Sequence, residues 1–195
     1  MKYLIRAVPE RDISYLKRNI PNAEVYLDTE HEGCIKSFID ALNYIDDDCV
    51  FVQDDVLLCE NFIEKSVGII MSHKSDVIIF CNMTLDKMCK DVTKSGYYTA
   101  RKGFWQYCTY IPRDIQKGFI RWINRRDFIG VPNIKRILES DMDDALFARY
   151  LDQYNEKVYV VVPNLAGHDY TQESVVNKNR PKRKTENFDY ERMAK

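Results

Sequence analysis

The chain has 195 residues and a formal net charge of −1 at pH 7, with 45% hydrophobic and 30% charged residues. This is the composition of an ordinary globular protein, and the length suits one domain with a sizeable core. The six cysteines form no CxxC pair and several lie in apolar runs, so we expect buried free thiols in a reducing compartment rather than a disulfide or zinc framework. No apolar run approaches the roughly 20 residues that span a bilayer, and Arg6 interrupts the first apolar stretch. We therefore expect a cytoplasmic protein without a membrane segment or signal peptide, and nothing in the sequence points to an obligate protein partner.

Strands and helices alternate along the predicted secondary structure. Apolar runs predict strands at 3–8, 23–27, 49–53, 76–80, 107–111 and 157–162. Helical spacing of apolar residues and capping signals predict helices at 12–19, 35–45, 62–70, 112–123 and 140–154. This alternation predicts an α/β fold with a mostly parallel central sheet flanked by helices.

Acidic side chains follow two of the predicted strands. Asp54 and Asp55 come directly after the buried run 49–53, and Asp28 follows the strand at 23–27. In a parallel sheet these ends meet at one edge, where open α/β sheets bind ligands. Two carboxylates on rigid backbone suit Mg²⁺ or Mn²⁺, which keep open positions for phosphate oxygens. The alternative is an acidic turn that caps the next helix.

Charge is distributed unevenly along the chain. Residues 24–64 are rich in Asp and Glu, whereas residues 97–127 carry seven Lys or Arg against Asp114 and Asp127. Residues 178–184 hold five basic side chains in seven positions. From 175 to 195 the chain is polar and basic, and we expect a mobile tail after a domain of residues 1–174.

In its order of motifs, the chain resembles a small glycosyltransferase of the GT-A fold, a single nucleotide-binding α/β domain. The resemblance covers about residues 1–174. It is carried by the acidic motif Gln53-Asp54-Asp55, by Asp143-Asp144 at the start of a later helix, and by His168 after the last strand. Gln53 stands where a strict DxD motif has its first Asp.

The resemblance implies roles for these residues. Asp55, then Asp54, and His168 would hold Mn²⁺ or Mg²⁺ against the diphosphate of a nucleoside-diphosphate sugar, in the first place a UDP-sugar. Asp143 or Asp144 would take the proton of the acceptor hydroxyl if the reaction inverts configuration, or would orient the acceptor if it retains it. Capping of the helix by these two carboxylates is the alternative.

Donor binding is expected from Arg11, Asp28, Lys36 and Asp54, near the same sheet edge. Asp28 resembles the family residue that bonds the base or ribose, and Arg11 and Lys36 could reach the base or diphosphate. A solvated surface charge is the alternative for both basic residues.

The acceptor is less constrained. Basic residues interleave with aromatic ones between 97 and 126, which suits phosphates and stacked bases. This makes DNA with a modified base one candidate acceptor, with Arg101, Trp105 and Arg125 as contacts, as in small phage and viral transferases. A surface saccharide is the alternative acceptor. The alternative functions are a non-catalytic nucleic-acid-binding protein and a nucleotidyltransferase. A nucleotidyltransferase usually has a Gly-rich phosphate loop near the first strand, which residues 8–11 lack.

Overall fold

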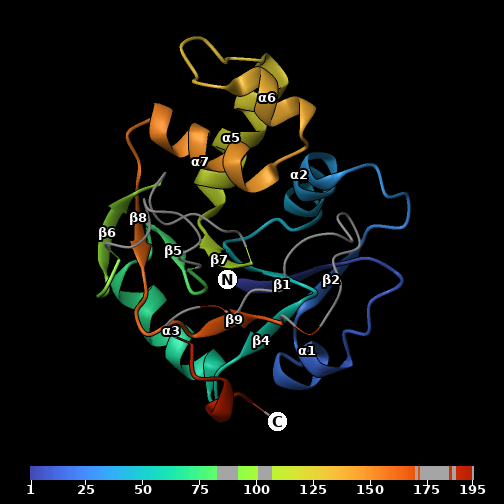
Figure 1. Cartoon of the computed structure of the whole chain (residues 1–195), viewed down its shortest axis with the longest axis vertical. Coiled ribbons are helices and arrows are strands. Elements are labelled where there is room, and N and C mark those ends of the chain that lie inside the picture. The colour runs from blue at the N-terminus through green and yellow to red at the C-terminus, as the bar shows by residue number, and fades with distance from the viewer. Residues whose placement is uncertain (83–91, 101–106, 170, 172–184, 186–187, 195) are drawn as a thin grey trace.

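The protein forms a seven-stranded sheet in the order β2-β1-β3-β7-β5-β8-β6, together with a separate two-stranded sheet, β4-β9 (Figure 1). This arrangement comes from a computed structural model, which describes residues 1–82, 92–100, 107–169, 171, 185 and 188–194. The strands are β1 (Lys2–Ala7), β2 (Glu24–Leu27), β3 (Cys49–Gln53), β4 (Val56–Leu58), β5 (Val77–Ile79), β6 (Gly96–Thr99), β7 (Cys108–Ile111), β8 (Lys157–Val160) and β9 (Ala166–His168). The helices are α1 (Ser14–Asn19), α2 (Cys34–Tyr44), α3 (Phe62–Ser72), α5 (Arg113–Arg125), α6 (Ile134–Glu139) and α7 (Asp143–Gln153), with a 3-10 turn, η1, at Tyr190–Arg192.

Most strands of the large sheet run in one direction. β1 pairs in parallel with β2 and β3, and β5 pairs in parallel with β8, whereas β7 and β6 run antiparallel to their neighbours. β7 lies between β3 and β5 and is antiparallel to both. The strands β2, β1, β3, β5 and β8 therefore all point the same way. The predicted mostly parallel α/β sheet flanked by helices is therefore confirmed.

Two apolar cores cover the two faces of the sheet, as alternation along the strands requires. Leu4, Phe51 and Ile79 face the helices α2, α5, α6 and α7, which lie on one side of the sheet (Figure 1). The neighbouring residues Ile5 and Val52 face the other side, which carries α1 and α3.

The sheet β4-β9 was not expected from the sequence. Val56 pairs with His168 and Leu58 with Ala166, so that a turn after β3 is joined to a strand more than 100 residues later. The end of the chain lies along it: Ala194 donates its backbone N–H to Leu58, and Cys59 pairs with Met193. These last described residues contact the domain, whereas a mobile tail was expected from 175 onwards; residues 172–184 lie outside the described part.

Three of the described cysteines, Cys49, Cys81 and Cys108, are buried as expected, whereas Cys34 and Cys59 are partly exposed. The five cysteines that the structure describes (34, 49, 59, 81 and 108) are free thiols. Burial raises the pKa of Cys49 and Cys81 to about 12, so these thiols are protonated and unreactive. Among the described residues, no helix is both long and apolar enough to cross a membrane.

Candidate active site

Asp55 and His168 meet beyond the carboxyl end of β3. His168 Nε2 lies 3.1 Å from Asp55 Oδ2, and the two side chains are only 13% and 15% exposed. Pairing of β4 with β9 fixes this contact, because Val56 lies opposite His168 and Asp169 donates its N–H to the Asp55 carbonyl. The ring of Tyr107 packs edge-on against the imidazole, with centroids 5.0 Å apart. Two side chains 113 positions apart in the sequence are thus in contact, and both are largely buried.

The geometry of this pair fits a divalent cation. The 3.1 Å contact is a hydrogen bond within the pair, and two ligand atoms about 2.1 Å from one cation and at right angles to each other would also lie about 3 Å apart. Within the described residues, Asp55 Oδ1 and His168 Nδ1 are buried and have no hydrogen-bond partner. In the part of the chain that the structure describes, no group of three or more Asp, Glu, His or Cys side chains is arranged to hold a metal ion. The protein would supply two ligands, which suits Mg²⁺ or Mn²⁺ because these ions keep positions for water and substrate phosphates.

The C-terminal segment, defined here as the described residues between 185 and 194, holds the backbone of His168. Thr185 Oγ1 accepts the His168 N–H at 2.8 Å, and the Tyr190 hydroxyl donates to the His168 carbonyl at 3.1 Å while accepting the Thr185 N–H. The Phe188 ring covers Gly167, where an added Cβ would come within 2.5 Å of it. His168 is therefore fixed by β4 on one side and by the C-terminal segment on the other.

Asp54 turns away from this pair, towards β1. Its Oδ2 accepts the backbone N–H of Val8 at 3.1 Å. Burial, reinforced by the charge of Asp55, raises the pKa of Asp54 to about 6, although the Val8 N–H and the positive charges of Arg11 and Arg6 oppose the rise. Asp54 and Asp55 are adjacent in the sequence, but Asp54 contacts the Val8 backbone and Asp55 contacts His168.

Asp143, at the first turn of α7, forms an ion pair with Arg6 of β1. Arg6 Nη1 lies 2.7 Å from Asp143 Oδ2, and both side chains are nearly buried. Burial disfavours the charged guanidinium, but Asp143 outweighs this and raises the pKa of Arg6 above its ordinary value. Asp144 is the more exposed of the two acidic residues, and its Oδ1 accepts the N–H of Ala145. Arg6 was missed as a site residue, although a charge between the apolar residues of a predicted strand signals a buried partner.

Asp141, just before α7, caps α2. Its carboxylate accepts the backbone N–H groups of Cys34 and Ile35, the first two residues of that helix. Gly33, the N-cap of α2, has no capping side chain, and an added Cβ there would meet the Asp141 carboxylate. The start of α2 and the start of α7 are thus held together beside Arg6, which also donates to the Cys34 carbonyl.

The predicted donor-binding residues divide into two groups. Asp28 is buried at the end of β2, where it bonds to the Ala7 carbonyl through its N–H and accepts the His31 N–H at 3.0 Å. Arg11 follows β1, and its charge acts on Asp54. Lys36 instead lies on the surface of α2, with Nζ 2.6 Å from both Glu32 and Asp40, and these bonds raise its pKa. Its charge is therefore engaged by Asp40 of the same helix and by Glu32 just before it.

The predicted acceptor contacts do not gather at this edge within the described structure. Arg101 and Trp105 lie outside the described residues. Arg125 is exposed at the last turn of α5, near Trp122, whose Nε1 donates to Gln153 at the end of α7. Asp143 lies at the other end of α7, about 15 Å away at 1.5 Å per residue. The C-terminal part of α5 is thus remote from the acidic residues.

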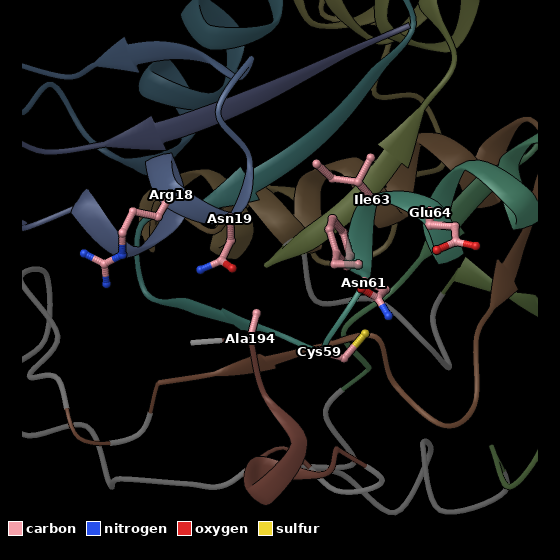
Figure 2. A pocket seen from close by; sticks show the side chains of 8 residues that line it. Arg18, Asn19, Cys59, Asn61, Ile63, Glu64 and Ala194 are labelled. Carbon is pink, nitrogen blue, oxygen red and sulfur yellow. The ribbon is translucent and has the colours of Figure 1, made fainter.

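A pocket of about 410 Å³ opens elsewhere, between α1, the start of α3 and the end of the chain (Figure 2). Its lining includes Arg18, Asn19, Asn61, Glu64 and Ala194. None of the predicted site residues lines it, so it is separate from the acidic edge.

Comparison with solved structures agrees with the fold. The protein is similar to A197 from STIV, with a TM-score of 0.52 and 17% identity over 86% of this chain and 85% of that chain. A weaker overlap is found with S. aureus TarS 1-349 in complex with UDP, with a TM-score of 0.49 and 16% identity over 83% of this chain and 58% of that one. Neither the protein-family models nor the curated protein sequences gave a match. At this identity the likeness concerns the fold.

Proposed function

We propose that the protein is a metal-dependent glycosyltransferase that moves a sugar from a nucleoside-diphosphate donor, in the first place a UDP-sugar, to an acceptor hydroxyl. The observation that carries this proposal is the Asp55–His168 pair at 3.1 Å, with Asp55 Oδ1 buried and unpaired among the described residues. A buried acceptor atom without a partner is costly, which favours a site for an additional ligand. The pair lies where open α/β sheets bind nucleotides.

The cation, when bound by Asp55 and His168, would neutralise the departing diphosphate. Asp28, at the end of β2, would bond the base or ribose of the donor. Arg11 would supply positive charge beside Asp54. We leave Lys36 out of the donor site because Glu32 and Asp40 already hold its ammonium group.

Asp143 and Asp144 would act on the acceptor. In an inverting reaction the acceptor oxygen forms a bond to the anomeric carbon, the bond from that carbon to the diphosphate oxygen breaks, and a carboxylate takes the hydroxyl proton. Asp143 is engaged by Arg6, and Asp144 is the more exposed, so Asp144 is the better-placed base and Asp143 its rigid neighbour. In a retaining reaction the same carboxylate would orient the acceptor.

DNA remains a candidate acceptor with reduced support. Trp122 and Tyr107 of the basic and aromatic segment are buried, at 2% and 4% exposure, and cannot stack on bases. Tyr97 is 51% exposed, but its hydroxyl bonds to Asp76 and its ring packs on Tyr159. Trp105 and Arg101 lie outside the described residues. If DNA is the acceptor, the protein should transfer sugar to DNA that contains a hydroxylated pyrimidine, and this activity should fall steeply as the salt concentration rises. The same assay should be run with saccharide acceptors for comparison.

Hydrolysis of UDP-sugars without an acceptor tests the proposal. Asp55→Asn and His168→Gln should each lower Mn²⁺-dependent hydrolysis about a thousandfold, since metal-ion catalysis supplies several kcal/mol. Calorimetry should show matching losses of Mn²⁺ affinity. The control is His73→Gln, because His73 Nδ1 lies 3.4 Å from Asp76 in a second His–Asp pair on the surface.

His73→Gln should keep wild-type hydrolysis and wild-type Mn²⁺ binding. Wild-type protein that neither binds Mn²⁺ nor hydrolyses any nucleotide sugar would contradict the proposal and favour a binding protein without catalysis.

A further inference from the structure

The connection between α5 and α6 exposes an apolar tip at one end of the molecule. It lies at the top of Figure 1, at the end of the longest axis, and residues 128–134 carry no charge. Ile129 within it is 88% exposed, the highest value among the large hydrophobic side chains that the structure describes. Single exposed apolar side chains are common on protein surfaces, so the meaning of this one depends on the residues around it.

This tip is built on a fixed base. The Phe128 ring packs on buried Trp122 with centroids 4.8 Å apart, and Val131 donates its N–H to the Phe128 carbonyl. Phe128, Val131 and Ile134 pack against the core. Ile129, between these anchored residues, points outward because its neighbours occupy the inward positions.

Exposed basic residues stand on both sides of the tip. Arg125 ends α5 and Arg126 is its C-cap, with Asp127 the next residue, while Lys135 and Arg136 lie within the six-residue α6. Among the described ion pairs, only Lys135 has a partner here, Glu139 at 3.8 Å. The helix dipole favours the basic residues at the end of α5 and Arg136 in the last turn of α6, whereas it disfavours Lys135, which pairs with Glu139. All four basic side chains are nevertheless exposed around the tip.

We propose that this connection docks on an anionic lipid surface, with Ile129 among the acyl chains and the flanking residues Arg125, Arg126, Lys135 and Arg136 at the headgroup phosphates. An apolar tip between basic flanks matches the layered chemistry of such a surface. A nucleic acid would match the charge but would leave Ile129 in water, and the nearest aromatic residues, Trp122 and Phe128, pack inward rather than presenting faces to bases. The inference does not depend on the proposed function.

Co-sedimentation with vesicles tests the proposal, using the whole chain. Wild-type protein should bind phosphatidylcholine vesicles that contain 50% phosphatidylglycerol, and should bind pure phosphatidylcholine vesicles much more weakly. Neutralising both arginines in Arg125→Gln/Arg126→Gln should weaken binding about 25-fold, since each basic residue near an anionic surface contributes about fivefold. Ile129→Ser should weaken it about tenfold by removing the apolar contact.

Two matched controls separate this surface from general effects. Lys17→Gln/Arg18→Gln removes an exposed basic pair from α1, and Met71→Ser removes the 74% exposed methionine of α3. Both should bind the anionic vesicles as the wild type does, and thermal unfolding of each variant checks that it is folded. No binding to anionic vesicles, or Ile129→Ser binding as tightly as wild type, would overturn the proposal. Binding to duplex DNA but not to vesicles, lost in Arg125→Gln/Arg126→Gln, would overturn it in favour of a nucleic-acid surface.

Discussion

Asp54 shows how the environment of one side chain decides its charge. Its carboxyl group lies between the negative charge of Asp55 and the positive charges of Arg6 and Arg11. Burial and Asp55 prevail, so the pKa rises from 3.8 to about 6. In the protein without metal, this side chain is ionised at neutral pH at a cost in stability.

The sign of that cost gives a prediction for Asp54→Asn. The folded state binds the Asp54 proton more tightly than the unfolded chain does, so this contribution is fully present below pH 4 and is lost as the pH rises through 6. The introduced Asn side chain does not titrate, so the variant keeps its free energy of unfolding where the wild type loses part of its own. The free energy of unfolding of the variant relative to wild type should therefore increase between pH 4 and pH 7 by on the order of 2 kcal/mol. Urea unfolding in EDTA at pH 4, 5, 6, 7 and 8 measures the difference. Parallel pH profiles for the two proteins would contradict the assigned shift.

At the scale of elements, β9 depends on the C-terminal segment as much as on β4. The backbone of His168 lies between Val56 of β4 on one side and Thr185 and Tyr190 on the other. The candidate metal ligand therefore sits on a strand of three residues whose position is set by distant parts of the chain.

Tyr190→Phe tests this dependence because it removes one hydroxyl and keeps the ring. The hydroxyl donates to the His168 carbonyl and accepts from the Thr185 N–H, so its loss should destabilise the fold by about 1 kcal/mol. If the segment orients His168, Mn²⁺ affinity measured by calorimetry should fall about tenfold, as for other residues that support metal ligands.

Tyr44→Phe is the control, since Tyr44 is 54% exposed on α2 and should change neither quantity. Unchanged Mn²⁺ affinity in Tyr190→Phe, with the expected loss of stability, would reduce the C-terminal segment to a purely structural role.

The same elements show what the sequence could predict. The long strands and helices follow from local apolar patterns, and the parallel edge then brings Asp28, Asp54 and Asp55 to one side of the sheet. The strands β4 and β9 have three residues each and exist only through their mutual pairing, so local patterns could not reveal them. The strand β6 has no buried residue and the helix α6 buries only Ile137, so neither carries an apolar pattern that could have revealed it.

For the whole molecule, long-range polar contacts connect the candidate site to the fold. Arg6 and Asp143 are 137 residues apart, and their ion pair joins β1 to the start of α7, while Asp141 joins that start to α2. Polar contacts therefore hold the carboxyl edge of the sheet together. Of the residues that make them, Asp143 was predicted to be catalytic, and Arg6 and Asp141 were not predicted to have a role.

A double-mutant cycle measures this contact. Arg6→Met and Asp143→Leu should each destabilise the fold by about 3 kcal/mol or more, because each leaves a nearly buried charge whose partner has been removed. The double variant replaces both charges by apolar groups and should be less destabilised than the sum of the two, by at least about 2 kcal/mol. The exposed pair Lys2–Glu24, at 2.6 Å, provides the control cycle, with an expected coupling below about 1 kcal/mol. Urea unfolding at pH 7 gives all the free energies, and additive effects at positions 6 and 143 would show that their ion pair does not hold β1 and α7 together.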